Sequence, residues 1–98
     1  MRQDGVMPNT TVPTPLSAPV APIRVAVVED DAACRIALVA ALNAASDMRL
    51  LWALASRAEA LAALNAVGAE PPDVLLVDLG LPDGSGLEVI AAARARWP

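Results

Sequence analysis

The sequence contains no lysine, histidine, phenylalanine or tyrosine, and it has a single cysteine, Cys34. One cysteine cannot form an internal disulfide, and one cysteine without any histidine cannot supply the set of nitrogen and sulfur ligands that a zinc site usually has. Proteins that bind nucleic acid need a basic surface and often aromatic rings, whereas this chain has a formal net charge of −4. We therefore expect no direct nucleic-acid contact by this segment, and we expect Cys34 to be a small residue of the core.

Long apolar stretches are also missing. Continuous runs such as that from Ala37 to Leu42 are far shorter than the roughly 18 residues that suggest a membrane span. No basic segment followed by an apolar block resembles a signal peptide. We therefore expect no membrane contact and a cytoplasmic location. With 98 residues, 56% of them hydrophobic, the chain is long enough for one domain with a buried core.

Prolines are concentrated at the amino-terminal end of the chain. Five of the nine lie among threonines and small residues without hydrophobic periodicity, at positions 8, 13, 15, 19 and 22. This composition predicts a disordered, partly polyproline leader over residues 1–22. One alternative is a proline-rich ligand for a partner domain, although no basic residue flanks the prolines between 8 and 22. Another is a start codon placed too far upstream.

From residue 23 onward, strand and helix patterns alternate. Apolar runs predict three strands, over 23–28, 48–55 and 73–78. The first is rich in β-branched residues, as is typical of a strand buried on both faces. Helices are predicted over three ranges: about 32–45, from 56 to a stop at Gly68, and 87–97. This order predicts one α/β domain over residues 23–98, with a parallel sheet, right-handed crossovers and helices on its faces.

Polar residues mark the starts of these helices. Asp31 is expected to cap the first helix. The other two are each expected to begin with a capping box, in which a serine precedes a glutamate by three residues: Ser56 with Glu59, and Ser85 with Glu88. The apolar face of the first helix is expected to consist of Ile36, Val39 and Leu42, widened by Cys34, Leu38 and Ala41.

Carboxylates follow two of the predicted strands. Glu29, Asp30 and Asp31 end the first strand, and Asp78 ends the third. If these strands are neighbours, the acids share the corner of the sheet where ligands bind in such folds. Two like charges about 4 Å apart repel by roughly 4 kcal/mol at an effective dielectric constant near 20, so the cluster needs a cation, a proton or greater separation. The alternative is that residues 29–31 only cap a helix and that Asp78 only faces solvent.

An all-oxygen set of ligands suits a hard cation such as Mg²⁺. The segment after Asp78 supports a metal site, because Pro82, the Asp83-Gly84 turn and Gly86 predict a fixed rim over residues 79–86, whose carbonyls could bind a metal. Once a cation neutralises the corner, an ionised Asp78 can act as a nucleophile and form an aspartyl-phosphate.

Two segments, VAVVEDDAACRIAL and VLLVDLGLPDGSGLEVI, and the distance between them closely resemble the receiver domain of two-component response regulators. The second segment is most similar to regulators with a helix-turn-helix output domain, and the resemblance spans about residues 23–98. It implies a flavodoxin-like doubly wound parallel sheet, with Asp78 as the phosphoacceptor and as a ligand of Mg²⁺. It also implies that Asp30 binds the ion directly, that Glu29 binds it through water, and that the Gly80 carbonyl is a further ligand.

The resemblance implies a cytoplasmic phosphorelay protein that is not a turnover enzyme. Such a protein accepts a phosphoryl group from a sensor histidine kinase or a phosphotransfer protein. It would regulate transcription through an output domain that this chain does not contain. The alternative from enzymology is a phosphatase like the haloacid dehalogenase-like hydrolases, but that family has a second aspartate at the position where this chain has Gly80.

The chain also departs from the receiver pattern. A receiver has five βα units, and this sequence has the first three, βαβαβα. The Ser or Thr that ends the fourth strand and the Lys that ends the fifth have no counterpart. The strand over 74–78 would then be an edge, so we expect the chain alone to be marginally stable or to self-associate there. A second hypothesis is therefore a truncated receiver that cannot switch and acts only as a protein interaction module.

Overall fold

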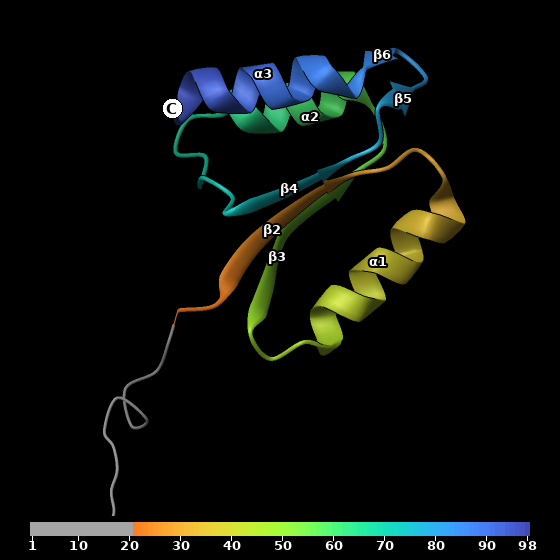
Figure 1. The fold of residues 1–98 in the computed structure, drawn as a ribbon, viewed down its shortest axis with the longest axis vertical. Coiled ribbons are helices and arrows are strands. Elements are labelled where there is room, and N and C mark those ends of the chain that lie inside the picture. Colours follow the sequence, from red (N-terminus) through yellow and green to blue (C-terminus); the bar gives the residue numbers. More distant parts are fainter. Residues whose placement is uncertain (1–20) are drawn as a thin grey trace, which may run out of the picture.

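In the computed structural model, which describes residues 21–98, strands and helices alternate along the chain (Figure 1). Apart from residues 21 and 22, the predicted proline-rich leader lies outside the described residues. The elements are β2 (Ile23–Val28), α1 (Ala32–Ala44), β3 (Met48–Leu54), α2 (Arg57–Asn65), β4 (Val74–Val77), β5 (Gly80–Leu81), β6 (Gly84–Ser85) and α3 (Gly86–Arg96). The short strands β5 and β6 were not predicted; the other elements follow the predicted order, with small differences at their ends.

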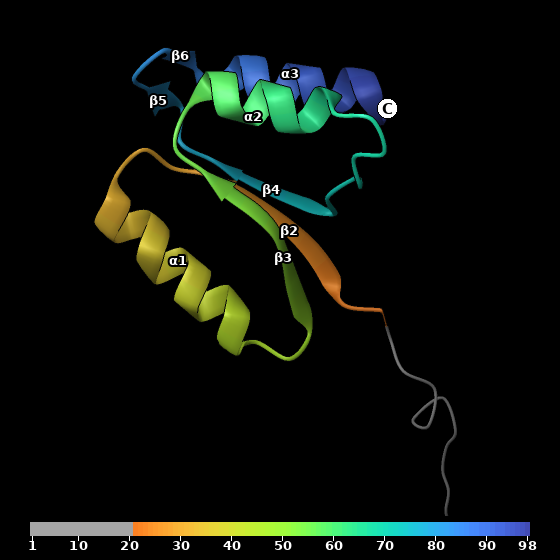
Figure 2. The same cartoon turned by 180° about the vertical axis from the view of Figure 1, so that it is seen from behind.

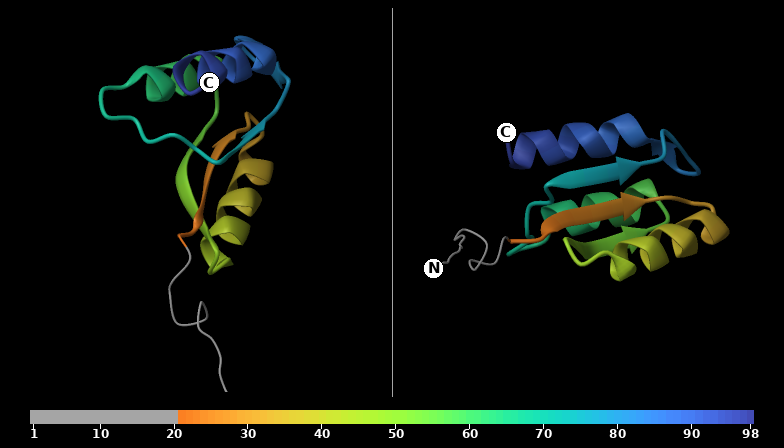
Figure 3. Two further views of the ribbon diagram at one scale, coloured as in Figure 1. Left: turned by 60° about the vertical axis from the view of Figure 1, so that its left-hand side comes forward. Right: turned by 60° about the horizontal axis from the view of Figure 1, so that its bottom comes forward.

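The main sheet has three parallel strands in the order β3-β2-β4 (Figure 3). The first strand of the domain is therefore central, and the third lies directly beside it, which is the arrangement that brings the predicted acids together. This order is consistent with a truncated flavodoxin-like receiver fold, in which crossover helices separate parallel strands.

Side chains of β2 alternate between two cores. Val25 and Val27 pack with Leu42 beneath α1. Val28 joins the other core, on the opposite face beneath α2 and α3, with Ala60, Leu64, Leu81 and Val89. Figures 1 and 2 show the two helices together on one side of the sheet and α1 on the other. Each fully buried valine or leucine contributes about 1.5–3 kcal/mol, so these cores hold β2 in the middle of the domain.

Helix α1 covers less of the sheet than its apolar residues suggested. It packs against β3 and β2, chiefly through Leu38 and Leu42. Ile36, which was predicted to be part of the apolar face, is 67% exposed. On β4, Val74 and Leu76 are 42% and 39% exposed. One face of the sheet is therefore only partly covered by the residues that the structure describes.

The predicted helix caps are largely confirmed. Asp31 accepts a hydrogen bond from the Cys34 amide at 2.8 Å, and Ser56 accepts one from the Glu59 amide at 3.2 Å. Glu59 reaches back to the amide of Ala55 rather than to that of the serine. The bonds accepted by Asp31 and Ser56 satisfy amide donors of the first helical turn, which have no partner within the helix.

The capping box predicted at Ser85 does not form. Ser85 does cap α3, but its hydroxyl accepts from the Leu87 amide at 3.1 Å. Glu88 instead accepts a hydrogen bond from the Arg57 guanidinium of α2 at 2.6 Å. A charged partner on the neighbouring helix offers the glutamate a stronger bond than a neutral amide does. The prediction was wrong because local spacing does not show which helix lies alongside α3.

At the amino end of the sheet, Arg24 and Asp73 hold β2 and β4 in register. The Asp73 carboxylate accepts from the amide and the guanidinium of Arg24 at 2.9 to 3.1 Å, and the Asp73 amide donates to the Arg24 carbonyl at 2.8 Å. Hydrogen bonds from the Arg24 side chain and amide lower the pKa of Asp73 to about 2. Among residues 21–98, no helix is both long enough and apolar enough to cross a membrane.

Candidate functional site

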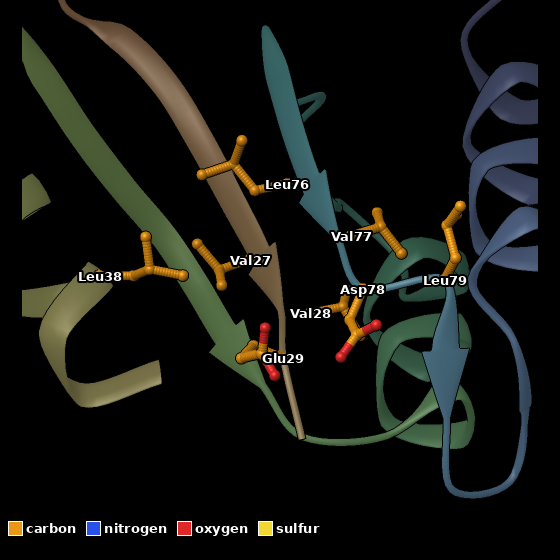
Figure 4. Close-up of a pocket in the computed structure, with 8 residues that line it drawn as sticks. All are labelled: Val27, Val28, Glu29, Leu38, Leu76, Val77, Asp78 and Leu79. Carbon is orange, nitrogen blue, oxygen red and sulfur yellow. The ribbon is translucent and has the colours of Figure 1, made fainter. Parts of the chain in front are cut away.

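Three carboxylates meet at the carboxyl end of β2 and β4. Glu29 and Asp30 follow β2, Asp78 follows β4, and one carboxylate oxygen of each lies within 4.8 Å of the others. Glu29 and Asp78 are half-buried, whereas Asp30 is exposed. Figure 4 shows Glu29 and Asp78 beside an open groove. The groove has a volume of about 580 Å³, and its other walls are Leu79 and apolar side chains of β2, α1 and β4.

The register of the sheet explains this cluster. Val28 pairs with Val77 in parallel strands, so the residues that follow them leave the sheet side by side. The Asp78 amide donates to the Val28 carbonyl at 2.9 Å, and the Glu29 amide donates to the Leu54 carbonyl of β3 at 2.9 Å. Both acids are thereby attached through their backbones to the neighbouring strand of the sheet, Asp78 to β2 and Glu29 to β3.

The loop between β2 and α1 is held by its own side chains. The Glu29 carboxylate accepts from the Asp31 amide at 3.0 Å, while the Asp31 carboxylate caps α1. Asp31 is therefore the helix cap, as the sequence predicted. The Arg35 guanidinium reaches back from α1 and donates to the carbonyl of Glu29 at 2.8 Å.

Asp78 is held by the segment that follows it. The Gly80 amide donates to Asp78 Oδ1 at 3.0 Å, and the Gly86 amide donates to the Leu79 carbonyl at 3.0 Å. A Cβ atom on Gly86 would lie 2.3 Å from the Asp78 carbonyl oxygen, so only glycine fits where α3 begins. Gly80 thus contacts Asp78 through its amide; its carbonyl as a metal ligand stays a prediction.

Residues 79–86 form a tethered rim, not a free linker. Within the segment, β5 and β6 pair antiparallel, and Leu81 is buried in the core beneath α2 and α3. The Asp83 carboxylate accepts from the amides of Arg57 and Ala58 at 2.8 Å each. These two hydrogen bonds lower the pKa of Asp83, and the bond from the Ala58 amide has the larger effect. The rim is therefore fixed to the first turn of α2.

Cys34 is not the core residue that its helical spacing predicted. It is exposed, although it lies on the same stripe of α1 as Leu38 and Leu42. The helix begins beyond the carboxyl edge of the sheet, so its first turn lies over the acids and not over apolar side chains. Desolvation, followed by the negative charge of Glu29, raises the pKa of the Cys34 thiol.

Two residues that support the site were missed in the sequence. Arg35 contacts the end of β2, and Asp83 binds the start of α2, although the sequence predicts only a turn at Asp83. An arginine four residues after a predicted helix cap was an available signal for the first. The second has no local signal, because its partners lie 25 and 26 residues earlier in the chain.

The comparisons with known proteins agree with this geometry. A family model described as the response regulator receiver domain matches residues 25–98. The transcriptional regulatory protein KdpE from two strains of Mycobacterium tuberculosis, CDC 1551 / Oshkosh and ATCC 25618 / H37Rv, is 53% identical over 32 residues, which are 33% of this chain. The match spans only 14% of the length of these relatives. No solved structure matches the chain significantly. The chain therefore belongs to the response regulator receiver domain family, the signalling modules of two-component systems.

Proposed function

We propose that this receiver accepts a phosphoryl group on Asp78 from the phosphohistidine of a sensor kinase or phosphotransfer protein, with Mg²⁺ as the cofactor. The observation that carries the proposal is the meeting of Glu29, Asp30 and Asp78 within 4.8 Å at the ends of adjacent parallel strands. Such a cluster repels itself unless a cation or a proton offsets its charge. Membership of the receiver family supports the same chemistry.

The donor set fits a small, hard cation. All three side chains offer carboxylate oxygens, and the described residues contain no histidine that would favour a softer metal. We assign Asp30 and Asp78 as direct ligands, Glu29 as a ligand through water, and the Gly80 carbonyl as a further ligand. When bound, Mg²⁺ supplies charge neutralisation for the carboxylates and for the transferring phosphoryl oxygens.

Asp78 supplies the nucleophile. The Gly80 amide holds Oδ1, and no hydrogen bond among residues 21–98 engages Oδ2. Oδ2 is thus the oxygen available for attack on phosphorus. An O–P bond forms as the P–N bond of the phosphohistidine breaks, and the imidazole nitrogen keeps the bonding electron pair and takes a proton from solvent. The fixed rim over residues 79–86 maintains the orientation of the carboxylate during the transfer.

We further propose that the phosphorylated domain regulates transcription in the cytoplasm through an output domain. Support comes from KdpE, which is named a transcriptional regulatory protein. The receiver itself has a net charge of −4 and carries its acids at the site, so any contact with DNA belongs to the output domain.

Removal of the metal tests this function directly. The chain is first to be checked by circular dichroism for a folded spectrum. It is then incubated with an acyl phosphate donor and Mg²⁺, and its intact mass is measured. We expect addition of one phosphoryl group, and we expect EDTA to prevent it while the circular dichroism spectrum is unchanged. Equal phosphorylation with Mg²⁺ and with EDTA would contradict the metal-dependent mechanism, and no addition in either would contradict phosphotransfer.

We also propose that the chain self-associates through the edge strand over 74–78, which is what the interaction-module hypothesis needs. The outer edge of β4 pairs with no strand among the described residues, and Val74 and Leu76 are exposed there. An unpaired apolar edge favours pairing with another chain.

Sedimentation velocity tests this association. We expect the sedimentation coefficient of the unmodified chain to rise with protein concentration, and we expect Leu76→Lys to abolish the rise because a charge on the edge opposes pairing. Val67→Lys is the matched control, because Val67 is fully exposed in the turn after α2. A monomeric chain with one cooperative unfolding transition would refute the proposal.

A further inference from the structure

Arg35 contacts the acidic loop through backbone carbonyls and not through carboxylates. Its guanidinium Nη1 donates to the Glu29 carbonyl at 2.8 Å and lies 3.4 Å from the Asp30 carbonyl. Both acceptors are backbone oxygens of the residues that carry the site's acids. None of the ion pairs found among residues 21–98 includes Arg35.

These carbonyls have no partner in the sheet. After Val28 the chain leaves the sheet, so the Glu29 and Asp30 oxygens have no place in the ladder of strands. They also precede α1, whose first backbone bond runs from the Arg35 amide to the Asp31 carbonyl at 2.9 Å. Arg35 thus fixes the loop twice, through its amide at Asp31 and through its guanidinium at Glu29 and Asp30. A charged donor makes the stronger kind of hydrogen bond to such oxygens.

The contact also leaves the carboxylates of Glu29 and Asp30 unpaired with the guanidinium. An arginine paired with Glu29 or Asp30 would compete with a metal ion for the same oxygens. Here the planar guanidinium is occupied by carbonyls, while the side chain of Glu29 is oriented separately by the Asp31 amide. The loop is ordered without neutralising the groups that would bind the cation.

We propose that Arg35 is a positioning residue, which fixes the backbone of Glu29 and Asp30 so that their carboxylates converge with Asp78 on the cation. This inference rests on the proposed function, because the cation is the one assigned there. Loss of a positioning residue and loss of a positive charge change the Mg²⁺ affinity in opposite directions. A nearby positive charge alone repels Mg²⁺, so its removal would tighten binding, whereas loss of positioning would weaken binding.

The test is calorimetric titration of the folded chain with Mg²⁺ alone, for the unmodified protein, Arg35→Met, Arg35→Lys and Arg94→Met. Arg94 lies in the last turn of α3, away from the acids, and its replacement changes the net charge equally. We expect Arg35→Met to weaken Mg²⁺ binding roughly tenfold, the lower end of the effect of removing groups that orient metal ligands. Arg35→Lys keeps a single point-like donor, so its Mg²⁺ affinity should lie between those of the unmodified chain and Arg35→Met. The affinity of Arg94→Met should match that of the unmodified chain.

A second readout needs no metal. Amide hydrogen exchange, followed by mass spectrometry of the peptide that spans 28–35, should be faster in Arg35→Met than in Arg94→Met. If Arg35→Met does not fold, Arg35→Lys decides: weaker Mg²⁺ binding than in the unmodified chain supports the proposal, and equal or tighter binding overturns it.

Mg²⁺ binding in Arg35→Met that is equal to or tighter than in Arg94→Met would overturn the inference and leave the proposed function intact. If the unmodified chain binds no Mg²⁺, the proposed function fails instead. The exchange measurement then still decides whether Arg35 orders the loop, with equal exchange in the two variants overturning it.

Discussion

Asp78→Asn is expected to abolish phosphorylation by an acyl phosphate in the presence of Mg²⁺, as measured by intact mass. The asparagine keeps a side-chain oxygen that can accept the hydrogen bond from the Gly80 amide, so the geometry of the rim is preserved. What it removes is the negative charge that makes Oδ2 a nucleophile and a metal ligand. The loss should therefore be complete, not partial.

The same substitution should not unfold the protein. It removes one of three carboxylates that lie within 4.8 Å, and so it relieves like-charge repulsion in the absence of metal. We expect a melting temperature at least equal to that of the unmodified chain. Asp47→Asn is the matched control, because Asp47 is exposed in the turn before β3, and it should be phosphorylated normally. A phosphoryl group on Asp78→Asn would show that another residue is the acceptor.

Gly86→Ala is expected to cause the largest loss of stability among single-methyl additions near the site. Helix propensity alone predicts the opposite, since alanine is favoured over glycine in a helix by about 1 kcal/mol. The structure instead indicates that the substitution destabilises the protein. The added Cβ would lie 2.3 Å from the Asp78 carbonyl oxygen and 2.7 Å from Cγ1 of Val77. The nearer atom belongs to the backbone and cannot rotate away, so α3 or the end of β4 must move.

We expect Gly86→Ala to lower the free energy of unfolding by about 1–3 kcal/mol, as overpacking in a filled core does. Urea denaturation measures it. Gly80→Ala is the control for stability, because the nearest atom to its Cβ would be Asp78 Oδ1 at 4.0 Å, an ordinary contact. A stabilised Gly86→Ala variant would mean that propensity outweighs the clash and that the approach of α3 to β4 is looser than the structure shows.

The acids of the site could be predicted because they follow directly from the strand pattern. Apolar runs located β2 and β4, and parallel strands carry their carboxyl ends to one edge of a sheet. Glu29, Asp30 and Asp78 then meet whenever the two strands are neighbours, which the structure confirms. The caps at Asp31 and Ser56 could also be predicted from the sequence, since a cap depends on residues within one turn.

Contacts between segments that are distant in the chain could not be predicted from the sequence. Glu88 satisfied the spacing of a capping box, yet it binds Arg57, which lies 31 residues away. Asp83 resembled a turn residue and proved to bind α2. Cys34 and Ile36 followed the apolar period of α1, but burial also depends on how far the sheet extends beneath the helix.

The sequence by itself determined the order of strands and helices and the acids that follow the strands, because periodicity, caps and strand ends are local properties of the chain. The receiver family came from the resemblance of two segments to that family, which the family model confirms. Only the tertiary structure decided how these acids are held. Arg35 binds the loop after β2, Asp83 ties the rim to α2, and Gly86 admits α3 against Asp78. Each of these contacts depends on the distance and direction between elements, which are set by packing of the two cores on β2 and which no pattern within a single element contains.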